Sequence, residues 1–443
     1  MNTYETVVGM EIHVELSTQS KMFCRCSVPT LSDKPNTRTC PVCLGLPGAL
    51  PFPNKQAVED CIKIGLALNC SINTKSFFER KNYFYPDLAK GFQTSQYLHP
   101  FGEKGYLDIQ VGKETKRIGI TRVHMEEDTG KLTHSTVDGK EVSLIDFNRS
   151  GVPLVEIVTE PDIRTGEEAR IFLTELQKII RYLDVSDADM EKGHMRLEPN
   201  ISLRPLGQKE LAKYKVEVKN INSFKFVEKA IEFEEKRHKE LLDKNETPVQ
   251  ETRGWNEFKN ITVSQRSKEE AHDYRYFPEP DIPPIEFSDS EVGAIKSQIP
   301  ELPEEKTKRY TSDFLLTDYN AEILTRDKAV SDFFEEAVRV GKEHNVGAVA
   351  IANFIINKKP NLEELEPAGL VKHIVEQSVI VQVDEDVLSE TLKTILSENT
   401  KAVEEYKAGK IQLIGFFIGQ TRKALPDAKD TEQIRNALLK MLE

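Results

Sequence analysis

The chain has few cysteines and no long apolar segment. Only six of its 443 residues are cysteine, too few for a disulfide scaffold in a protein of this size. No stretch approaches the roughly 20 apolar residues that a membrane-spanning helix needs, and the first residues lack the basic and apolar segments of a signal peptide. We therefore expect a cytoplasmic protein with reduced thiols and no association with a membrane.

The common nucleotide-binding and hydrolase motifs are also missing. The sequence has no Gly-x-x-x-x-Gly-Lys-Ser/Thr loop, no Gly-x-Gly-x-x-Gly turn between strand and helix, and no Gly-x-Ser-x-Gly elbow. These absences argue against the common nucleotide and hydrolase folds. A bound nucleotide would have to be held by metal ions on carboxylates and by separate Lys and Arg side chains.

The charge is acidic overall and slightly basic at the end. A net charge of −13 argues against indiscriminate binding to nucleic acid, because such binding depends on neutralising phosphates. Residues 401–443 nevertheless carry eight basic and six acidic side chains. We expect this tail to contact RNA locally, and we expect no binding to DNA.

Length and composition predict several domains. A chain of 443 residues is too long for one core. Its first part is rich in short strands, Pro, Gly and aromatics, with helical patterns at 166–183 and 224–242, and its later part is helical. The predicted fold class is α+β, with a domain built on antiparallel sheet at 1–292 and two small all-helical domains at 293–382 and 383–443.

Polar residues alternate with apolar ones in several extended segments. In the segment 9–16, Glu11, His13 and Glu15 alternate with Met, Ile, Val and Leu, so that a strand would place the two kinds on opposite faces. The mostly apolar segment 152–158, with Glu156 as its only charged residue, is typical of a strand covered on both faces. The same alternation occurs in 118–127 (Arg122, His124, Glu126), in 195–203 (Arg196, Glu198, Asn200, Ser202) and in 216–219.

These segments have two interpretations. The first is an ordinary antiparallel sheet with one solvated face, whose charges keep the protein soluble. The second is an active site, because carboxylates recur beside histidines where a solvated face would carry Lys, Thr, Gln and Ser. Hard oxygen and imidazole ligands suit Mg²⁺ or Mn²⁺ together with phosphate. We interpret the polar face as a metal and phosphate site.

Four cysteines form two close pairs. Cys24 and Cys26 are separated by one residue, and Cys40 and Cys43 by two. Two pairs joined by a loop can supply four thiolates to one tetrahedral zinc ion, although the first pair is tighter than the usual spacing. The alternative is a set of unrelated reduced thiols. Four protein ligands would leave no open position, so the predicted zinc site is structural.

Three segments combine cations, amides and aromatic rings. They are residues 81–87, 91–97 and 267–276. Each one alone could be a loop whose tyrosines cover the edge of a core with their hydroxyls outward. Their occurrence together with the acidic strands favours contacts with phosphate or substrate.

Six motifs together carry a family resemblance. They are Gly9–Leu16, the four cysteines with Cys43–Gly48, Arg80–Asp87, His124–Lys131, Val216–Ser223 and Ala271–Phe277. In this order they resemble the B subunit of the tRNA-dependent aspartyl/glutamyl amidotransferase (the GatB family), over essentially the whole chain.

The resemblance implies a fold and an activity. It implies a cradle-like catalytic domain, a helical domain and a tail that docks tRNA. ATP would phosphorylate the side-chain carboxylate of Glu-tRNA(Gln) or Asp-tRNA(Asn), and ammonia released from glutamine by the A subunit, a glutaminase, would then displace the phosphate. The C subunit would bridge the other two. The chain has no amidase-type Ser and Lys signature, so a partner would supply the ammonia.

The resemblance also implies site residues. Glu11, His13, Glu126 and Glu127 would be catalytic. The Mg²⁺ ligands would be Glu11, His13 and Glu126, with Glu127, Glu156 and Glu198 as further candidates. The Zn²⁺ ligands would be Cys24, Cys26, Cys40 and Cys43. Contacts to ATP or substrate would come from Lys81, Tyr83, Tyr85, Arg149, Lys219, Asn220 and Arg275.

The sequence departs from the family pattern in two places and leaves two alternatives. Between about residues 358 and 383 it is shorter than usual, and Glu198 is followed by Pro199 where many bacterial relatives have Asp and Ala. One alternative is a non-catalytic tRNA-binding scaffold. The other is a relative of the archaeal-type E subunit, for whose large insertion the chain has no room. The sequence does not choose between Glu-tRNA(Gln) and Asp-tRNA(Asn).

Overall fold

The structure is a computed structural model that describes residues 3–30, 32–267, 274–378, 384–426, 428 and 430–442. Residues 271–273 of one motif, and the boundary expected at 383, lie outside these ranges. Two compact units are formed by Met1–Lys308 with Arg326–Lys328, and by Arg309–Thr325 with Ala329–Glu443. The first unit is mixed α and β, and the second is helical, which confirms the predicted α+β class.

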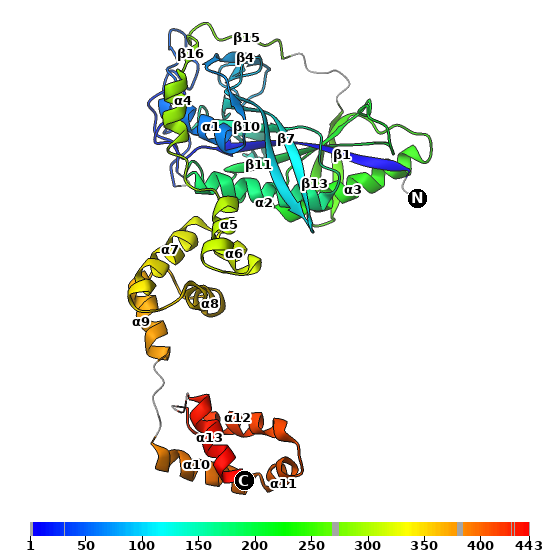
Figure 1. The fold of residues 1–443 in the computed structure, drawn as a ribbon. Helices are drawn as coiled ribbons and strands as arrows, with labels where there is room; N and C mark the ends of the chain where they lie inside the picture. Colours follow the sequence, from blue (N-terminus) through cyan, green and yellow to red (C-terminus); the bar gives the residue numbers. More distant parts are fainter. Residues whose placement is uncertain are drawn as a thin grey trace. The chain divides into compact units, whose positions relative to one another are not determined.

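A mixed sheet forms the centre of the first unit. Within the described residues it has nine strands, and β1 lies between β11 and β10, near the middle (Figure 1). Neighbouring strands are antiparallel, as predicted, except for the parallel pair β12 and β13. The order is β14 (Ile261–Ser267), β13 (Glu251–Asn256), β12 (Val216–Lys219), β11 (Met195–Pro205), β1 (Tyr4–Glu15), β10 (Pro153–Thr159), β7 (Glu114–Glu127), β6 (Gly102–Val111) and β2 (Ser71–Ile72).

The alternation in β1 fixes which face of the sheet is covered. Met10, Ile12 and Val14 are buried in the main apolar cluster, whereas Glu11 and His13 are only half-buried on the opposite face. Each fully buried aliphatic side chain stabilises the fold by roughly 1.5–3 kcal/mol relative to exposure. Turning β1 over would exchange these residues for charges, so its register is strongly specified.

The three longest helices of the first unit begin at side-chain caps. They are α1 (Lys55–Ala67), α2 (Gly166–Tyr182) and α3 (Phe224–Leu242), and the last two confirm the predicted helices. The cap residues Asn54, Thr165 and Ser223 each accept a hydrogen bond from a backbone N–H of the first turn. Helix α2 packs on β6 and on α3, and α3 packs on β11. The helices thereby cover the apolar face and leave the polar face open.

Small sheets add to the first unit. One of them has the order β15, β4, β5 and contributes residues to the polar face. Its strands β4 and β15 are labelled in Figure 1. The elements are β3 (Lys75–Ser76) with β16 (Ile285–Glu286), β4 (Glu79–Asn82), β5 (Phe92–Ser95) and β15 (Phe277–Pro278), the hairpin β8 (Lys131–Val137) with β9 (Lys140–Asp146), and α4 (Asp289–Lys296).

The second unit consists of helices around two apolar clusters. One cluster includes Phe334 and Ile351, and the other includes Leu392, Phe417 and Leu438. No helix in the described ranges is long and apolar enough to cross a membrane. The predicted domain boundaries remain a prediction. The helices that lie wholly or partly in this unit are α5 (Pro303–Asp313), α6 (Asp318–Leu324), α7 (Lys328–Glu343), α8 (Ala348–Lys358), α9 (Pro367–Ser378), α10 (Glu385–Glu398), α11 (Thr400–Lys407), the 3₁₀ turn η1 (Ile411–Leu413), α12 (Ile414–Ala424) and α13 (Thr431–Leu442).

Candidate active site

Three neighbouring strands bring together an imidazole and two carboxylates. His13 on β1 lies opposite Glu156 on β10, which lies opposite His124 on β7. Glu126 follows His124 by two residues and therefore shares its face. Ligand atoms of His13, Glu126 and Glu156 all lie within 4.8 Å of one another, which is a spacing that one metal ion could bridge.

The two histidines both approach the two carboxylates. The Nε2 atom of His13 is 3.6 Å from an oxygen of Glu156 and 3.9 Å from one of Glu126. The Nε2 atom of His124 is 3.2 Å from Glu156 and 3.6 Å from Glu126. The carboxylates and His124 are buried, and the Nδ1 atom of His124 has no hydrogen-bond partner. His13 is more exposed and faces the open side of the group.

The small sheet holds the carboxylate of Glu126 in place. Ser95 donates a hydrogen bond of 2.7 Å to one oxygen, and Gln93 donates one of 3.0 Å to the other. The Nζ atom of Lys81 lies 3.6 Å from Glu126. The two oxygens are therefore oriented by β4 and β5 as well as by the strand that carries the residue.

The electrostatics of this group favour charged forms. Burial would lower the pKa of His13, but the hydrogen bond to Glu156 and the charges of Glu156, Glu198 and Glu126 raise it to about 9. Burial would raise the pKa of Glu126, but the ammonium of Lys81 and the neighbouring His124 lower it to about 2. The carboxylates are thus ionised at neutral pH. A divalent cation could take over the positive charge that the protonated imidazole supplies.

A second acidic group adjoins the first. Ligand atoms of Glu11, Glu198 and Glu217 also lie within 4.8 Å of one another. Glu11 lies two residues before His13 on β1 and opposite Glu198 on β11. Burial raises the pKa of Glu11, and the charges of Glu156, Glu198 and Glu217 raise it further. Three carboxylates in one place provide a second position for a divalent cation.

Neighbouring side chains orient the second group. The Nζ atom of Lys219 is 2.9 Å from an oxygen of Glu198 and 3.5 Å from one of Glu217. Thr252 donates a hydrogen bond of 2.8 Å to Glu217, and Asn200 donates one of 3.0 Å to Glu11. The parallel pairing of β12 with β13 places Thr252 opposite Glu217. The polar face is therefore continuous from β7 to β12.

Glu127 lies apart from both groups. Because side chains alternate along β7, it points to the face opposite Glu126. Its carboxylate forms an ion pair with Lys90 and accepts a hydrogen bond of 2.9 Å from the backbone N–H of Thr94. It lines a cavity of about 170 Å³ beside the cysteines. The structure thus separates Glu127 from the other residues that were predicted as catalytic.

The structure gives four other predicted contact residues different surroundings. Arg149 donates hydrogen bonds of 3.0 and 2.8 Å to the carbonyls of Thr129 and Gly130, and its guanidinium is 3.5 Å from Asp128. The remaining three are Tyr85, which is exposed, and Asn220 and Arg275, which have positive φ angles of 60° and 42°.

Tyr83, by contrast, joins the shell around the first group. Its hydroxyl donates a hydrogen bond of 3.2 Å to Gln93, which in turn binds Glu126. Together with Lys81 and Lys219, it is one of three predicted contact residues that lie beside the acidic groups.

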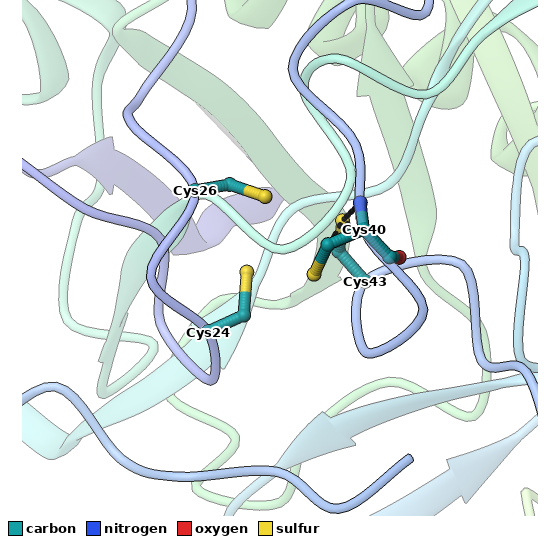
Figure 2. A group of neighbouring side chains, drawn as sticks. All are labelled: Cys24, Cys26, Cys40 and Cys43. Atoms are coloured by element: carbon teal, nitrogen blue, oxygen red, sulfur yellow. Dashed lines mark hydrogen bonds between the residues drawn. The ribbon is translucent and has the colours of Figure 1, made fainter.

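The four clustered cysteines converge on a common centre. Their sulfurs all lie within 4.8 Å of one another and point inward from two loops (Figure 2). The sulfurs of Cys40 and Cys43 are 3.8 Å apart, about the distance between two ligands of a tetrahedral ion with Zn–S bonds of about 2.3 Å. The backbone N–H of Cys40 also donates to the sulfur of Cys43 over 3.2 Å. These residues fit a structural zinc ion.

A fully buried lysine accompanies the cysteines. The Nζ atom of Lys21 is 3.6 Å from the sulfur of Cys43 and 3.4 Å from the carbonyl oxygen of Phe147. The pKa of Cys43 is lowered to about 5 by a hydrogen bond from Cys24, by the backbone of Cys40 and by the charge of Lys21. A buried cation beside a sulfur cluster is consistent with the negative charge of a tetrathiolate zinc centre.

Several residues of the site were not assigned from the sequence. His124 and Glu217 lie on the polar faces of strands that the alternation predicts. This position in the pattern was the signal in the sequence that could have identified them. Ser95, Gln93 and Thr252 gave no such signal, because their roles depend on which strands become neighbours. The sequence placed all Mg²⁺ ligands on one polar face without fixing the number of ions, and the structure divides these residues into two adjacent groups.

Comparison with protein families identifies the class. Residues 6–293 match the GatB/GatE catalytic domain, and residues 356–442 match the GatB domain. The first match contains the whole polar face and the cysteines. The protein is therefore a member of the class that carries a GatB/GatE catalytic domain.

Curated relatives define the family within this class. The chain is 44% identical to the aspartyl/glutamyl-tRNA(Asn/Gln) amidotransferase B subunit of Dehalococcoides mccartyi (strain ATCC BAA-2266 / KCTC 15142 / 195), over all of both chains. It is 45% identical to the same protein of Thermoanaerobacter pseudethanolicus (99% of this chain, 98% of the relative) and of Brevibacillus brevis (96% and 95%). The chain belongs to the family of aspartyl/glutamyl-tRNA(Asn/Gln) amidotransferase B subunits.

Proposed function

We propose that this chain activates the side-chain carboxylate of Glu-tRNA(Gln) or Asp-tRNA(Asn) for amidation. The observation that carries the proposal is the buried group of His13, Glu126 and Glu156 beside the acidic group of Glu11, Glu198 and Glu217. The names of the relatives supply the amidotransferase reaction and the tRNA substrates. The two acidic groups could bind cations, and these cations could bind the phosphates of a nucleoside triphosphate.

The reaction needs activation because a carboxylate has no good leaving group. A side-chain carboxylate oxygen attacks the γ-phosphorus of ATP, the bond to the bridging oxygen breaks, and ADP leaves. Ammonia then attacks the carbonyl carbon of the acyl phosphate, phosphate leaves, and the nitrogen loses a proton to give the amide. The first step concentrates negative charge around phosphorus, and stabilising that charge is the main task of such a site.

The residues present fit Mg²⁺, because they offer carboxylate oxygens and one imidazole on an open face. His13, Glu126 and Glu156 would hold one ion, and Glu11, Glu198 and Glu217 a second. When bound, Mg²⁺ would neutralise the charge of the phosphates. Lys81 and Lys219 lie beside the two groups and would bind phosphate oxygens or the substrate carboxylate.

The partners and the location follow from the reaction. Since the chain has no ammonia source of its own, the A subunit would release ammonia from glutamine, and the C subunit would join it to this chain. Action on tRNA supports a location in the cytoplasm. The cysteine group would hold Zn²⁺ as a structural ion, because all four ligand positions are filled by thiolates.

The direct test is transfer of labelled γ-phosphate from ATP to Glu-tRNA(Gln) by the assembled amidotransferase, without glutamine or ammonia. We expect label on the aminoacyl group with the wild type and a loss of roughly a hundredfold or more with Glu126→Gln. The affinity for tRNA should stay almost unchanged, because Glu126 is buried in the metal group.

Glu114→Gln is the matched control for this test. Glu114 stands at the exposed start of the same strand, far along β7 from the metal group. This variant should transfer label at the wild-type rate. Normal transfer by Glu126→Gln would refute the assignment of the site, and no transfer by the wild type would support a scaffold role for the chain.

A further inference from the structure

Two tyrosines and an arginine form a stack at the end of the polar face. The rings of Tyr97 and Tyr276 are parallel within 15°, with their centroids 4.8 Å apart, which is an offset stack. The guanidinium of Arg122 lies 5.4 Å from the centroid of Tyr97. Arg122 stands on the same face of β7 as His124 and Glu126. We call these three residues the aromatic stack.

The small sheet fixes the two rings relative to one another. The buried carboxylate of Glu79 on β4 accepts hydrogen bonds of 2.6 and 2.8 Å from the backbone N–H groups of Tyr97 and Leu98. Tyr276 directly precedes β15, whose residues pair with β4. Both rings are thus tied to the same strand. The stack is set by the fold and does not depend on a ligand to form.

The aromatic stack adjoins the group of His13, Glu126 and Glu156. Burial raises the pKa of Tyr276, the charge of Lys81 lowers it, and the charges of Glu126 and Glu156 raise it further. Arg122 precedes His124 by two residues, which is about 7 Å along a strand. A ligand whose phosphate or acyl group reaches Glu126 therefore has this stack within its reach.

The stack is open to a ligand. Tyr97 remains 48% exposed, and its offset from Tyr276 leaves part of the ring uncovered. The buried Nε atom of Arg122 has no hydrogen-bond partner, although a buried donor of this kind is costly to leave unpaired.

We propose that the aromatic stack of Tyr97, Tyr276 and Arg122 is a binding subsite for an adenine base. A flat base would extend the stack, since aromatic rings and guanidinium planes both stack on bases. Arg122 would donate to a ring nitrogen or a sugar oxygen. The adenine belongs either to ATP or to the terminal adenosine of the aminoacyl-tRNA. This inference rests on the proposed function, because it places one of the two substrates of that reaction.

The test compares Tyr97→Leu with Tyr97→Phe in the assembled amidotransferase. Dissociation constants are measured for ATP with Mg²⁺, for inorganic tripolyphosphate with Mg²⁺, and for Glu-tRNA(Gln) with and without its terminal adenosine. We expect Tyr97→Leu to weaken one adenine ligand roughly tenfold, and Tyr97→Phe to stay near the wild type because it keeps the ring. Affinity for tripolyphosphate, which has no base, should not change.

The arms of the experiment separate the two sources of the base. Weaker binding of ATP alone assigns the subsite to the nucleotide. Weaker binding of the complete tRNA, with no change for the tRNA that lacks its terminal adenosine, assigns it to the tRNA. Phe258→Leu is the control, since Phe258 is a 90% exposed ring in the turn between β13 and β14.

Two results would overturn the inference. One is a change below about twofold for both adenine ligands in Tyr97→Leu, and the other is an equal loss for tripolyphosphate, which would indicate general damage to the site. Transfer of labelled phosphate by the wild type is measured in the same preparation. If transfer occurs and the affinities do not change, the subsite alone is wrong, whereas a wild type without transfer refutes the proposed function itself.

Discussion

Glu234 shows how single buried charges are accommodated away from the active site. It is fully buried on α3 and is 2.9 Å from His238 and 2.6 Å from Arg237. It also accepts a hydrogen bond from Thr262 on β14 and lies 3.3 Å from Arg253 on β13. Such a network ties the helix to the edge of the sheet, and a buried charge without these partners would be strongly destabilising.

The network predicts acid sensitivity. Burial would raise the pKa of Glu234, but the hydrogen bonds from His238, Arg237 and Thr262 lower it to about 2 from a usual 4.5. A carboxyl whose folded pKa is lowered stabilises the fold above pH 4.5, and this contribution disappears as the pH falls towards 2. The contribution of Glu234 to the free energy of unfolding amounts to about 3 kcal/mol at neutral pH. We expect the free energy of unfolding to decrease across this range.

Glu234→Gln tests this prediction. Denaturant unfolding of the first unit should show a lower stability at pH 7 and a weaker dependence on pH between about 4.5 and 2 than in the wild type. Glu240→Gln, at an exposed position on the same helix, is the control and should keep the wild-type profile. An unchanged profile in Glu234→Gln would show that the network does not bind the charged form preferentially.

At the scale of elements, we expect the loops that carry the cysteines to depend on a bound ion. Between β1 and α1 the described residues contain no helix and no strand beyond isolated bridges. Gly151, which lies beside Cys43, has a φ of 84°, a backbone conformation that favours glycine. The loops therefore need another source of order, and a zinc ion would supply it.

Zinc removal should loosen these loops and leave the sheet folded. We expect one zinc ion per chain, and after treatment with a strong chelator we expect faster hydrogen exchange in residues 17–54 with little change in β1, β7 and β10. Cys43→Ser should behave in the same way without a chelator. Cys70→Ala removes a thiol outside the group and should keep the zinc. Equal exchange with and without zinc would refute a structural ion.

The sequence predicts the elements of the site better than their assembly. The alternation around His13 and the isolated charge of Glu156 were enough to expect strands and a polar face. Which strands become neighbours depends on contacts between distant residues, so the opposition of His13 to Glu156 and of Glu11 to Glu198 had no local signal. The same reason explains why Glu127 was grouped with Glu126, although alternation sends them to opposite faces.

At the scale of the whole molecule, the chain has separate apolar cores. The sheet and its helices share one apolar cluster, whereas residues of α10, α12 and α13 form another of their own. A part with its own core can be removed without exposing the core of the rest. Residues 401–443 also carry more basic than acidic side chains, although the chain is acidic overall.

Removal of residues 383–443 should therefore separate two binding activities. In the assembled amidotransferase, we expect the truncated chain to bind ATP like the wild type and to bind Glu-tRNA(Gln) at least about tenfold more weakly. The dependence of tRNA affinity on salt should also become less steep, because fewer phosphates are neutralised. Titrations at two salt concentrations measure both effects. Unchanged tRNA affinity would show that the tail has another role.

The central place of β1 has a consequence for the synthesis of the protein. Its neighbours β10 and β11 begin at Pro153 and Met195, so β1 leaves the ribosome long before either can pair with it. At roughly 5–20 residues per second, the interval between His13 and Glu156 lasts roughly 7–30 s. During this time a strand with one apolar face has two unpaired edges, which favours aggregation. The nascent chain is therefore expected to need a chaperone until its middle strands have been translated.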